Sequence, residues 1–430
     1  RTTAVGKMHF TPTYLDVGFD KMVLAEQGGA GRYVDDYHAW LMEHDLIDEL
    51  DTIEQVAEHR QRAPTDYWDS FGAQISNLDE KYHSTTWIGE QALDEISNWD
   101  RSKPSLLMAG FIKPHHPFDP PAQWANSYVP SALELPAGWT DEPLARDMAG
   151  SDPFFPMEKL TEQRFRKVLA YYYALISQVD YQVGRMVKLL LEKGLYDNTM
   201  IIYTSDHGEY LGYHHMLLKD GPLYDPIVKV PLVIKFPEGI RAGETHVGQV
   251  NSLDITATIL AAAFAEYPVN PLMPVELPGG DLRSATIDHE IIFAERWEAT
   301  LRKVMSGEFA KVIGSGGGLT SFMARTPEHK LLLDRRSVNT QFFDLGVDPY
   351  EMINLNQDDQ YRQIREELRE RIFDWLTFAN PVPMYTDSGA QQITGIHESR
   401  FETGHVKRVK EYFRQKIQHR LIRGIDSDNT

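Results

Sequence analysis

The residues with the clearest chemical potential are Asp206 and His207, which follow a short apolar segment. The segment Met200–Tyr203 has the pattern of a strand that is covered on both faces in a parallel sheet. Ligands of open α/β sheets bind beyond the carboxyl ends of the strands, so a site is expected where these two side chains lie. A carboxylate beside an imidazole can ligate a divalent cation. We predict that role for both, rather than a helix-capping aspartate and a satisfied histidine.

Lys219 follows in the segment Leu217–Lys219 and brings a cation back toward the same strand end. A lysine after a leucine pair is often only solvated. Its assignment to the site therefore depends on its neighbours in the fold.

The segment Gly6–His9 places Lys7 and His9 two residues apart, on one side of the chain if it is extended. The lysine could hold a developing oxyanion and the histidine could donate a proton to a leaving oxygen. Taken alone, the pair is equally compatible with a surface lysine and a core histidine.

A proline-rich segment, Lys113–Phe118, presents His115 and His116 beyond an apolar run. Prolines restrict the backbone on both sides, so the histidines are held on a stiff loop, as a catalytic site requires. The alternative is a surface loop with incidental histidines. Because a second strand end points to the same rim of the sheet, we favour function.

The elements that must position these residues alternate between short apolar strands and longer periodic helices, which predicts an α/β fold with a mostly parallel sheet. The segment Leu15–Gly31 is turn-rich. Strands are expected at Ala4–Val5, Ser105–Phe111, Met200–Tyr203 and Pro231–Phe236. Helices are expected at Val34–Leu50, Asp51–Ala63, His83–Trp99, Glu162–Lys193 and Ser252–Ala263.

Three regions are expected along the chain. The prolines and glycines of Pro268–Gly280 mark a boundary, so residues 1–285 form a catalytic domain. Residues 286–380 form a small subdomain with an antiparallel meander, and its closing helix is Asp358–Phe378. Residues 381–430 form a tail with a basic amphipathic helix. Its apolar stripe is Val406, Val409, Phe413, Ile417 and Leu421.

Composition restricts the partners of the chain. A formal net charge of −20 argues against nucleic acid or an anionic membrane as the main partner. The chain has no cysteine, which excludes disulfides and thiolate–metal sites, and no apolar run has the length of a membrane span. The basic tail is expected to dock on an acidic face of its own or a neighbouring subunit, and the second case would make the protein a homo-oligomer. The compartment is left open.

The motifs together resemble the sulfatases of the alkaline-phosphatase superfamily. The resemblance covers residues 1 to about 378 and implies an α/β/α sandwich with a small C-terminal antiparallel sheet. The segments that carry it, in order, are Gly6–His9, Gly110–Phe118, Tyr203–Gly212, His214–Lys219, Tyr224–Val233 and Phe342–Asn354.

This resemblance implies the roles of the site residues. Asp206 and His207 would hold a divalent cation, usually Ca²⁺ (Mg²⁺ or Mn²⁺ as alternatives), with two further ligands on the first strand. Catalysis would use a formylglycine nucleophile made from a Cys/Ser-x-Pro-x-Arg motif. The sulfate oxygens and the leaving group would be served by Lys7, His9, His115, His214 and Lys219.

The chain departs from the family pattern in one respect. It contains neither cysteine nor Ser-x-Pro-x-Arg, so the nucleophile motif is absent from these 430 residues. We expect that motif and the first strand to precede Arg1, and we expect this chain alone to be inactive.

The intact protein is expected to hydrolyse sulfate monoesters of small molecules or carbohydrates. The long excursion Asp119–Leu160 would help to select the organic part of the substrate. One alternative is a phosphonate monoester hydrolase or phosphodiesterase of the same superfamily. Such phosphonate hydrolases typically replace the Lys-x-His pair by Tyr and Thr, so Lys7 and His9 favour sulfate. The other alternative is a sulfatase-like binding protein without catalysis.

Overall fold

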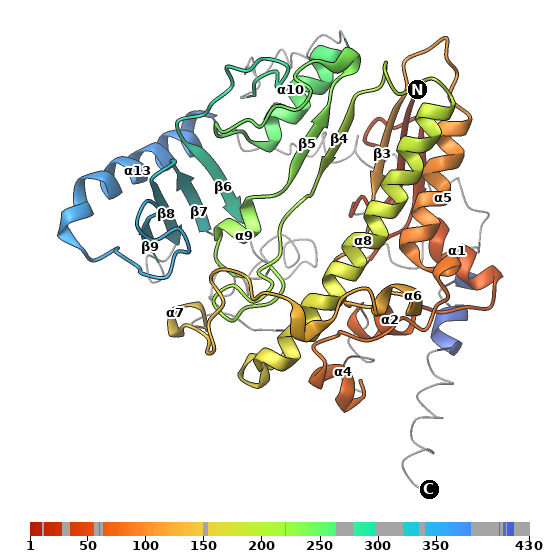
Figure 1. Ribbon diagram of the computed structural model, residues 1–430, viewed down its shortest axis with the longest axis horizontal. Helices are drawn as coiled ribbons and strands as arrows, with labels where there is room; N and C mark the ends of the chain where they lie inside the picture. The colour runs from red at the N-terminus through yellow and green to blue at the C-terminus, as the bar shows by residue number, and fades with distance from the viewer. Residues whose placement is uncertain are drawn as a thin grey trace, which may run out of the picture. The chain divides into compact units, whose positions relative to one another are not determined.

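The computed structural model describes residues 1–10, 13–27, 35–55, 60, 63–148, 154–219, 221–263, 279–296, 321–334, 340–379, 404, 407–409 and 411–416. The chain divides into two compact units, which are described separately (Figure 1). Unit 1 comprises residues 1–135, 159–197 and 384–430, and unit 2 comprises residues 136–158 and 198–383. The predicted domain limit at residue 285 falls inside unit 2. Residues 268–278 of the proline-rich boundary lie outside the described residues.

Unit 1 is built on a three-stranded parallel sheet in the order β2-β1-β3. Its strands are β1 (Thr2–Gly6), β2 (Lys21–Leu24) and β3 (Leu106–Gly110). In this register Gly6 lies opposite both Leu24 and Gly110, so the three strands end at one edge. Gly6 has a φ of +89°, and a Cβ atom there would lie 2.1 Å from the Gly110 carbonyl oxygen, so only glycine fits.

Helices cover this sheet. The helix α5 contacts β1 and β3 and packs on the long helix α8. Val5 and Val23 of the sheet share a core with Ile88 of α5, while Ala4 and Leu24 face a second cluster, as the alternation of side chains along a strand requires. The helical elements of unit 1 are α1 (Asp36–Glu43), α2 (Glu49–Gln55), α4 (Thr65–Asp69), α5 (Ser84–Ser97), α6 (Ala122–Ala125), α8 (Glu162–Glu192), η1 (Glu80–Tyr82) and η2 (Pro130–Ala132).

The predicted strands and helices of unit 1 are confirmed in part. The strands at Ala4–Val5 and Ser105–Phe111 correspond to β1 and β3, and the helices at His83–Trp99 and Glu162–Lys193 correspond to α5 and α8. The turn-rich interpretation of Leu15–Gly31 is wrong for residues 21–24, which form the strand β2. The strand was not predicted because it has only four residues.

The helix predicted at Val34–Leu50 is wrong in its extent, since α1 ends at Glu43 and α2 begins at Glu49. Of the following predicted helix, Asp51–Ala63, the first residues belong to α2. Residues 56–59, 61 and 62 lie outside the described residues.

The tail packs on unit 1. Residues 407–409 and 411–416 are helical, and Val409 and Phe413 lie buried in the same core as Val5. Lys416 Nζ lies 2.6 Å from Asp45 Oδ1. These residues dock on their own chain, while Val406, Ile417 and Leu421 lie outside the described residues and oligomerisation stays a prediction.

Unit 2 contains the paired strands β4 (Ile201–Thr204) and β5 (Leu232–Lys235). They run antiparallel to each other, and in the described part of the chain β5 is the only strand paired with β4. Tyr203 and Val233 are exposed. The prediction that Met200–Tyr203 is a buried strand of a parallel sheet is therefore wrong in both respects, because an apolar run specifies neither direction nor the number of neighbours.

The rest of unit 2 is organised around an antiparallel sheet in the order β6-β7-β8-β9. Its strands are β6 (Ile292–Arg296), β7 (Ser321–Arg325), β8 (His329–Asp334) and β9 (Gln341–Asp344). The predicted meander is confirmed. The remaining elements of unit 2 are α7 (Ala145–Met148), α9 (Asp225–Val228), α10 (Ser252–Ala262), α13 (Arg362–Asp374), η4 (Pro237–Gly239), η5 (Asp359–Tyr361) and η6 (Trp375–Ala379), while η3 (Met157–Lys159) spans a junction between the units.

The two faces of this antiparallel sheet have different partners. Leu331 and Leu333 pack with Ile372 of α13, and Leu332 between them packs with Tyr213 and Tyr224 of the segment after β4. The sheet therefore anchors that segment. Among the described helices, none is long and apolar enough to cross a membrane.

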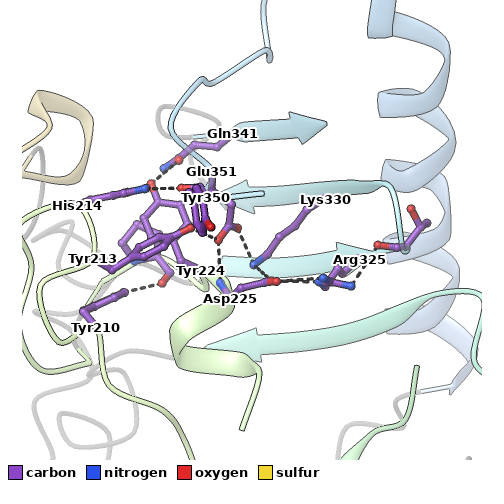
Figure 2. A network of polar contacts seen from close by, with 12 residues as sticks. Tyr210, Tyr213, His214, Tyr224, Asp225, Arg325, Lys330, Gln341, Tyr350 and Glu351 are labelled. Atoms are coloured by element: carbon purple, nitrogen blue, oxygen red, sulfur yellow. Dashed lines mark hydrogen bonds and ion pairs between the residues drawn. The ribbon is translucent and has the colours of Figure 1, made fainter. Parts of the chain in front are cut away.

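A buried ionic network strengthens this anchor (Figure 2). Lys330 is fully buried, and its Nζ lies 2.9 Å from Asp225 Oδ1 and 2.7 Å from Glu351 Oε1. Arg325 binds both oxygens of Asp225 at 3.0 Å. Burial alone would raise the pKa of Asp225, but Lys330 and Arg325 outweigh it and lower the pKa to about 2.

We expect Lys330→Met to destabilise unit 2 by about 3 kcal/mol, because it leaves two buried carboxylates without their shared cation. Amide hydrogen exchange of β8 measures this loss. The control is Arg369→Met, which removes an exposed ion pair with Glu366 on α13 and should cost less than about 1 kcal/mol. Equal effects of the two variants would contradict the role of the network.

Candidate active site

Asp206, His207 and Lys219 come together just beyond the end of β4. His207 Nε2 lies 2.7 Å from Lys219 Nζ and 3.5 Å from Asp206 Oδ2. The side chains of Asp206 and His207 are 68% and 29% exposed. Lys219 is thus a neighbour of His207 in unit 2.

The geometry of His207 suits a metal ligand. Its Nδ1 lies 2.8 Å from the Gly208 carbonyl oxygen, which can only accept, so Nδ1 carries the hydrogen and Nε2 keeps its lone pair. Metal-binding histidines usually donate their second nitrogen in this way. Asp206 and His207 therefore fit a divalent cation as two of its ligands. Among the described residues, no group of three or more metal-binding side chains occurs.

Glu209 closes the loop that brings Lys219 back to His207. Its Oε1 accepts the backbone N–H of Leu211 at 3.3 Å and that of Leu218 at a shorter distance. The Gly208 N–H donates to the Ile227 carbonyl oxygen at 2.8 Å, and a Cβ atom at Gly208 would collide with the Pro226 carbonyl. These contacts fix the chain directly after His207 and directly before Lys219.

His214 has a different environment from the other predicted residues (Figure 2). Its side chain is fully buried. The Nδ1 atom lies 3.1 Å from Asp147 Oδ2, and Nε2 lies 2.7 Å from the Tyr350 carbonyl oxygen. His214 thus bridges the Asp147 side chain on α7 and the backbone at Tyr350. Because its side chain is fully buried, we do not include it among the proposed substrate contacts.

In unit 1 the loops after the three parallel strands leave the sheet at the same end, where the carboxyl termini of the strands lie. The Lys7 N–H donates to the Gly110 carbonyl oxygen at 2.7 Å, and the Ala25 N–H donates to the Gly6 carbonyl oxygen at 3.1 Å. Lys7 and His9 after β1, and His115 after β3, therefore leave the sheet at the same edge.

Glu26 shapes the loop that carries Lys7 and His9. It is buried, and its Oε1 accepts the backbone N–H of Met8 at 3.0 Å and that of His9 at 2.9 Å. His9 has a φ of +57°, which is uncommon for a residue other than glycine. Its side chain is 59% exposed. Burial raises the pKa of Glu26 to about 7, although the hydrogen bonds from Met8 and His9 oppose this.

The His115 loop is supported by a buried ion pair. Lys113 Nζ lies 2.5 Å from Asp119 Oδ1 and donates to the Pro117 carbonyl oxygen at 2.8 Å. Burial would lower the pKa of Lys113, but Asp119 outweighs it and raises that pKa. His115 Nδ1 donates to the His116 carbonyl oxygen at 2.7 Å, which leaves the lone pair on Nε2. Lys113 therefore supports the loop, and His115 is its half-buried chemical group.

Comparison with known proteins identifies the family. The sequence model described as "Sulfatase" matches residues 1–265, and the one described as "N-sulphoglucosamine sulphohydrolase, C-terminal" matches residues 213–377. The chain belongs to the sulfatase family. Its α/β fold with a parallel sheet and a C-terminal antiparallel sheet fits the alkaline-phosphatase superfamily.

Individual sulfatase relatives extend this comparison. The chain is 27% identical to the arylsulfatase of Clostridium perfringens, over 86% of this chain and 74% of that protein. It is 22% identical to the N-acetylglucosamine-6-O-sulfatase of Bacteroides thetaiotaomicron, over 72% of this chain and 64% of that protein. The solved phosphonate monoester hydrolase of Agrobacterium radiobacter has a TM-score of 0.65 at 20% identity, over 87% of this chain and 77% of that one. The chain spans between about half and three quarters of the length of the curated relatives it matches.

Glu26 of this sulfatase-family chain is the residue that sequence reasoning missed. It follows the run Lys21–Leu24, and recognition of that run as a strand would have placed Glu26 at a strand end, where site residues gather. Glu209 was likewise not predicted from the sequence. Its role in the loop depends on two backbone contacts that no sequence pattern shows.

We expect Glu26→Gln to remove a pH dependence of stability. A carboxyl whose pKa rises from 4.5 unfolded to about 7 folded contributes stability below pH 4.5, and this is lost as the pH rises through 7. The loss is roughly 3 kcal/mol in total. Urea unfolding should therefore show the variant gaining on wild type between pH 5 and pH 8. Glu43→Gln, at an exposed position of α1, controls for the charge change, and parallel pH curves for wild type and Glu26→Gln would refute the assignment.

Proposed function

We propose that the protein is a sulfuric ester hydrolase that cleaves sulfate monoesters of carbohydrates or other small molecules. The observation that carries this proposal is the cluster of Asp206, His207 and Lys219 at a strand end, in a chain of the sulfatase family. An N-acetylglucosamine-6-O-sulfatase among the relatives supports a sulfated sugar as the substrate class.

The metal proposed for this site is Ca²⁺, with Mg²⁺ and Mn²⁺ as alternatives, and Asp206 and His207 would hold it. A bound divalent cation would polarise the sulfate oxygens and favour the ionised nucleophile. Lys219 Nζ donates to His207 Nε2 in the structure. When His207 uses its lone pair for the cation, we propose that the Lys219 ammonium turns to a sulfate oxygen and neutralises part of its charge.

In unit 1 the proposed roles belong to Lys7, His9 and His115. Lys7 supplies a positive charge for an oxygen of the ester. His9 has an exposed imidazole on a loop that Glu26 fixes, so it can deliver a proton to the departing alcohol or phenol oxygen. His115 offers its Nε2 atom as a further contact to the sulfate group.

The nucleophile of the reaction lies outside this set of residues. The resemblance implies formylglycine, but these 430 residues include neither cysteine nor Ser-x-Pro-x-Arg. The residues present do not fit that group. We propose accordingly that the 430 residues alone do not turn over sulfate esters.

A phosphonate monoester hydrolase is the second candidate. The likeness of the fold to that of the Agrobacterium radiobacter enzyme favours it. The Lys7–His9 pair speaks for sulfate, since the resemblance associates the phosphonate enzymes with Tyr and Thr at these positions.

Kinetics on the protein expressed from its complete gene decide between the two. We expect kcat/KM for an aryl sulfate to exceed that for the matching aryl phosphonate monoester, and Asp206→Asn to lower it at least about 100-fold because a metal ligand is lost. Asp359→Asn, at an exposed position of η5 in unit 2, should leave it unchanged. A preference for the phosphonate, or full activity of Asp206→Asn, would overturn the proposal.

A further inference from the structure

The C-terminal helical segment, residues 407–409 and 411–416, contributes Val409 and Phe413 to the core of unit 1. Phe413 is 1% exposed, and its ring meets that of His38 on α1 edge-on, with centroids 5.3 Å apart and planes at 71°. On the same segment, Tyr412 donates its hydroxyl to the Leu46 carbonyl oxygen at 3.1 Å. The segment is thus clamped to the stretch of chain that follows α1.

His38 is held between Phe413 and the aspartate that caps α1. Its Nδ1 lies 2.8 Å and 2.9 Å from the two oxygens of Asp35, and both side chains are buried. Asp35 can only accept as a carboxylate, so His38 Nδ1 carries the hydrogen. The ring of Phe413 therefore limits where His38 can direct this hydrogen bond.

Asp35 in turn fixes the backbone beyond β2. Its Oδ2 accepts the Glu26 N–H at 2.5 Å, and the neighbouring Asp36 accepts the Leu24 N–H at 2.7 Å. The position of Glu26 thus depends on the first turn of α1. Glu26 Oε1 then accepts the N–H groups of Met8 and His9, and the His9 N–H also donates to Oε2 at 3.1 Å.

We propose that the C-terminal helical segment is a positioning element of the Lys7–His9 loop, acting through the contact series Phe413, His38, Asp35 and Glu26. All four side chains are at most 3% exposed, so each contact is made away from water and has little freedom to rearrange. The left-handed backbone at His9 persists because this series holds its N–H group. In this proposal Phe413 and His38 are positioning residues that act only through the loop.

The alternative is that residues 407–409 and 411–416 merely cover the core of unit 1. Val409 separates the two cases, because it is as buried as Phe413 and shares its cluster. If the segment only covers the core, loss of either side chain affects the Lys7–His9 loop through general loosening. If the series positions the loop, the Phe413 and His38 variants affect it selectively.

The test is amide hydrogen exchange at Met8 and His9 in the full chain, by NMR. We expect Phe413→Leu and His38→Leu to accelerate exchange at these two amides by up to about tenfold, since an aromatic edge contact or a buried hydrogen bond is lost. His38→Asn, which retains a donor near the Nδ1 position, should restore most of the protection. Val409→Ala should leave these two amides unchanged relative to the rest of unit 1. Equal acceleration in Val409→Ala and Phe413→Leu, or none in Phe413→Leu and His38→Leu, would overturn the proposal.

The kinetic consequence rests on the proposed function. In the protein expressed from its complete gene, Phe413→Leu should lower kcat more for aryl sulfates with poor leaving groups than for those with good ones, because His9 protonates the leaving oxygen. If exchange accelerates while kcat keeps its leaving-group dependence, the positioning stands and the role of His9 fails. If exchange does not change, the positioning fails whatever the kinetics show.

Discussion

The register of the parallel sheet is the constraint on which unit 1 depends. With Gly6 opposite both Leu24 and Gly110, the segments after β1, β2 and β3 leave the sheet at one edge. Gly6 is essential to that register, because any larger residue would collide with the Gly110 carbonyl. Once the edge is set, a buried carboxylate after β2 can hold the loop after β1. The positions of Lys7, His9 and His115 thus depend on the strand pairing and not on the loops alone.

In unit 2 the candidate site residues are positioned by an antiparallel strand pair and by buried side chains. The strand before Asp206 has an antiparallel partner, and the loop that follows it is fixed by Glu209 and by the network around Lys330 and Glu351. The antiparallel sheet is therefore part of the support of the site. His214 belongs to this support, since it links Asp147 to the chain near Glu351.

The part of this structure that the sequence predicts is the part set by local pattern. Asp206 and His207 follow an apolar run in both the prediction and the structure, and Lys219 returns to them. The direction of β4 was mispredicted, because an apolar run is the same in either orientation. Long-range contacts were not predictable: Glu26 meets Met8 and His9, and Phe413 meets His38, across separations that no periodicity encodes.

The most direct test of the central claim is anomalous diffraction from crystals of the protein, expressed from its complete gene and grown with Mn²⁺. We expect an anomalous peak bound by Asp206 and His207, with Lys219 Nζ no longer hydrogen-bonded to His207 Nε2. A structure in which Lys219 keeps that hydrogen bond and Mn²⁺ binds elsewhere, or does not bind, would show that Asp206 and His207 are not the metal ligands.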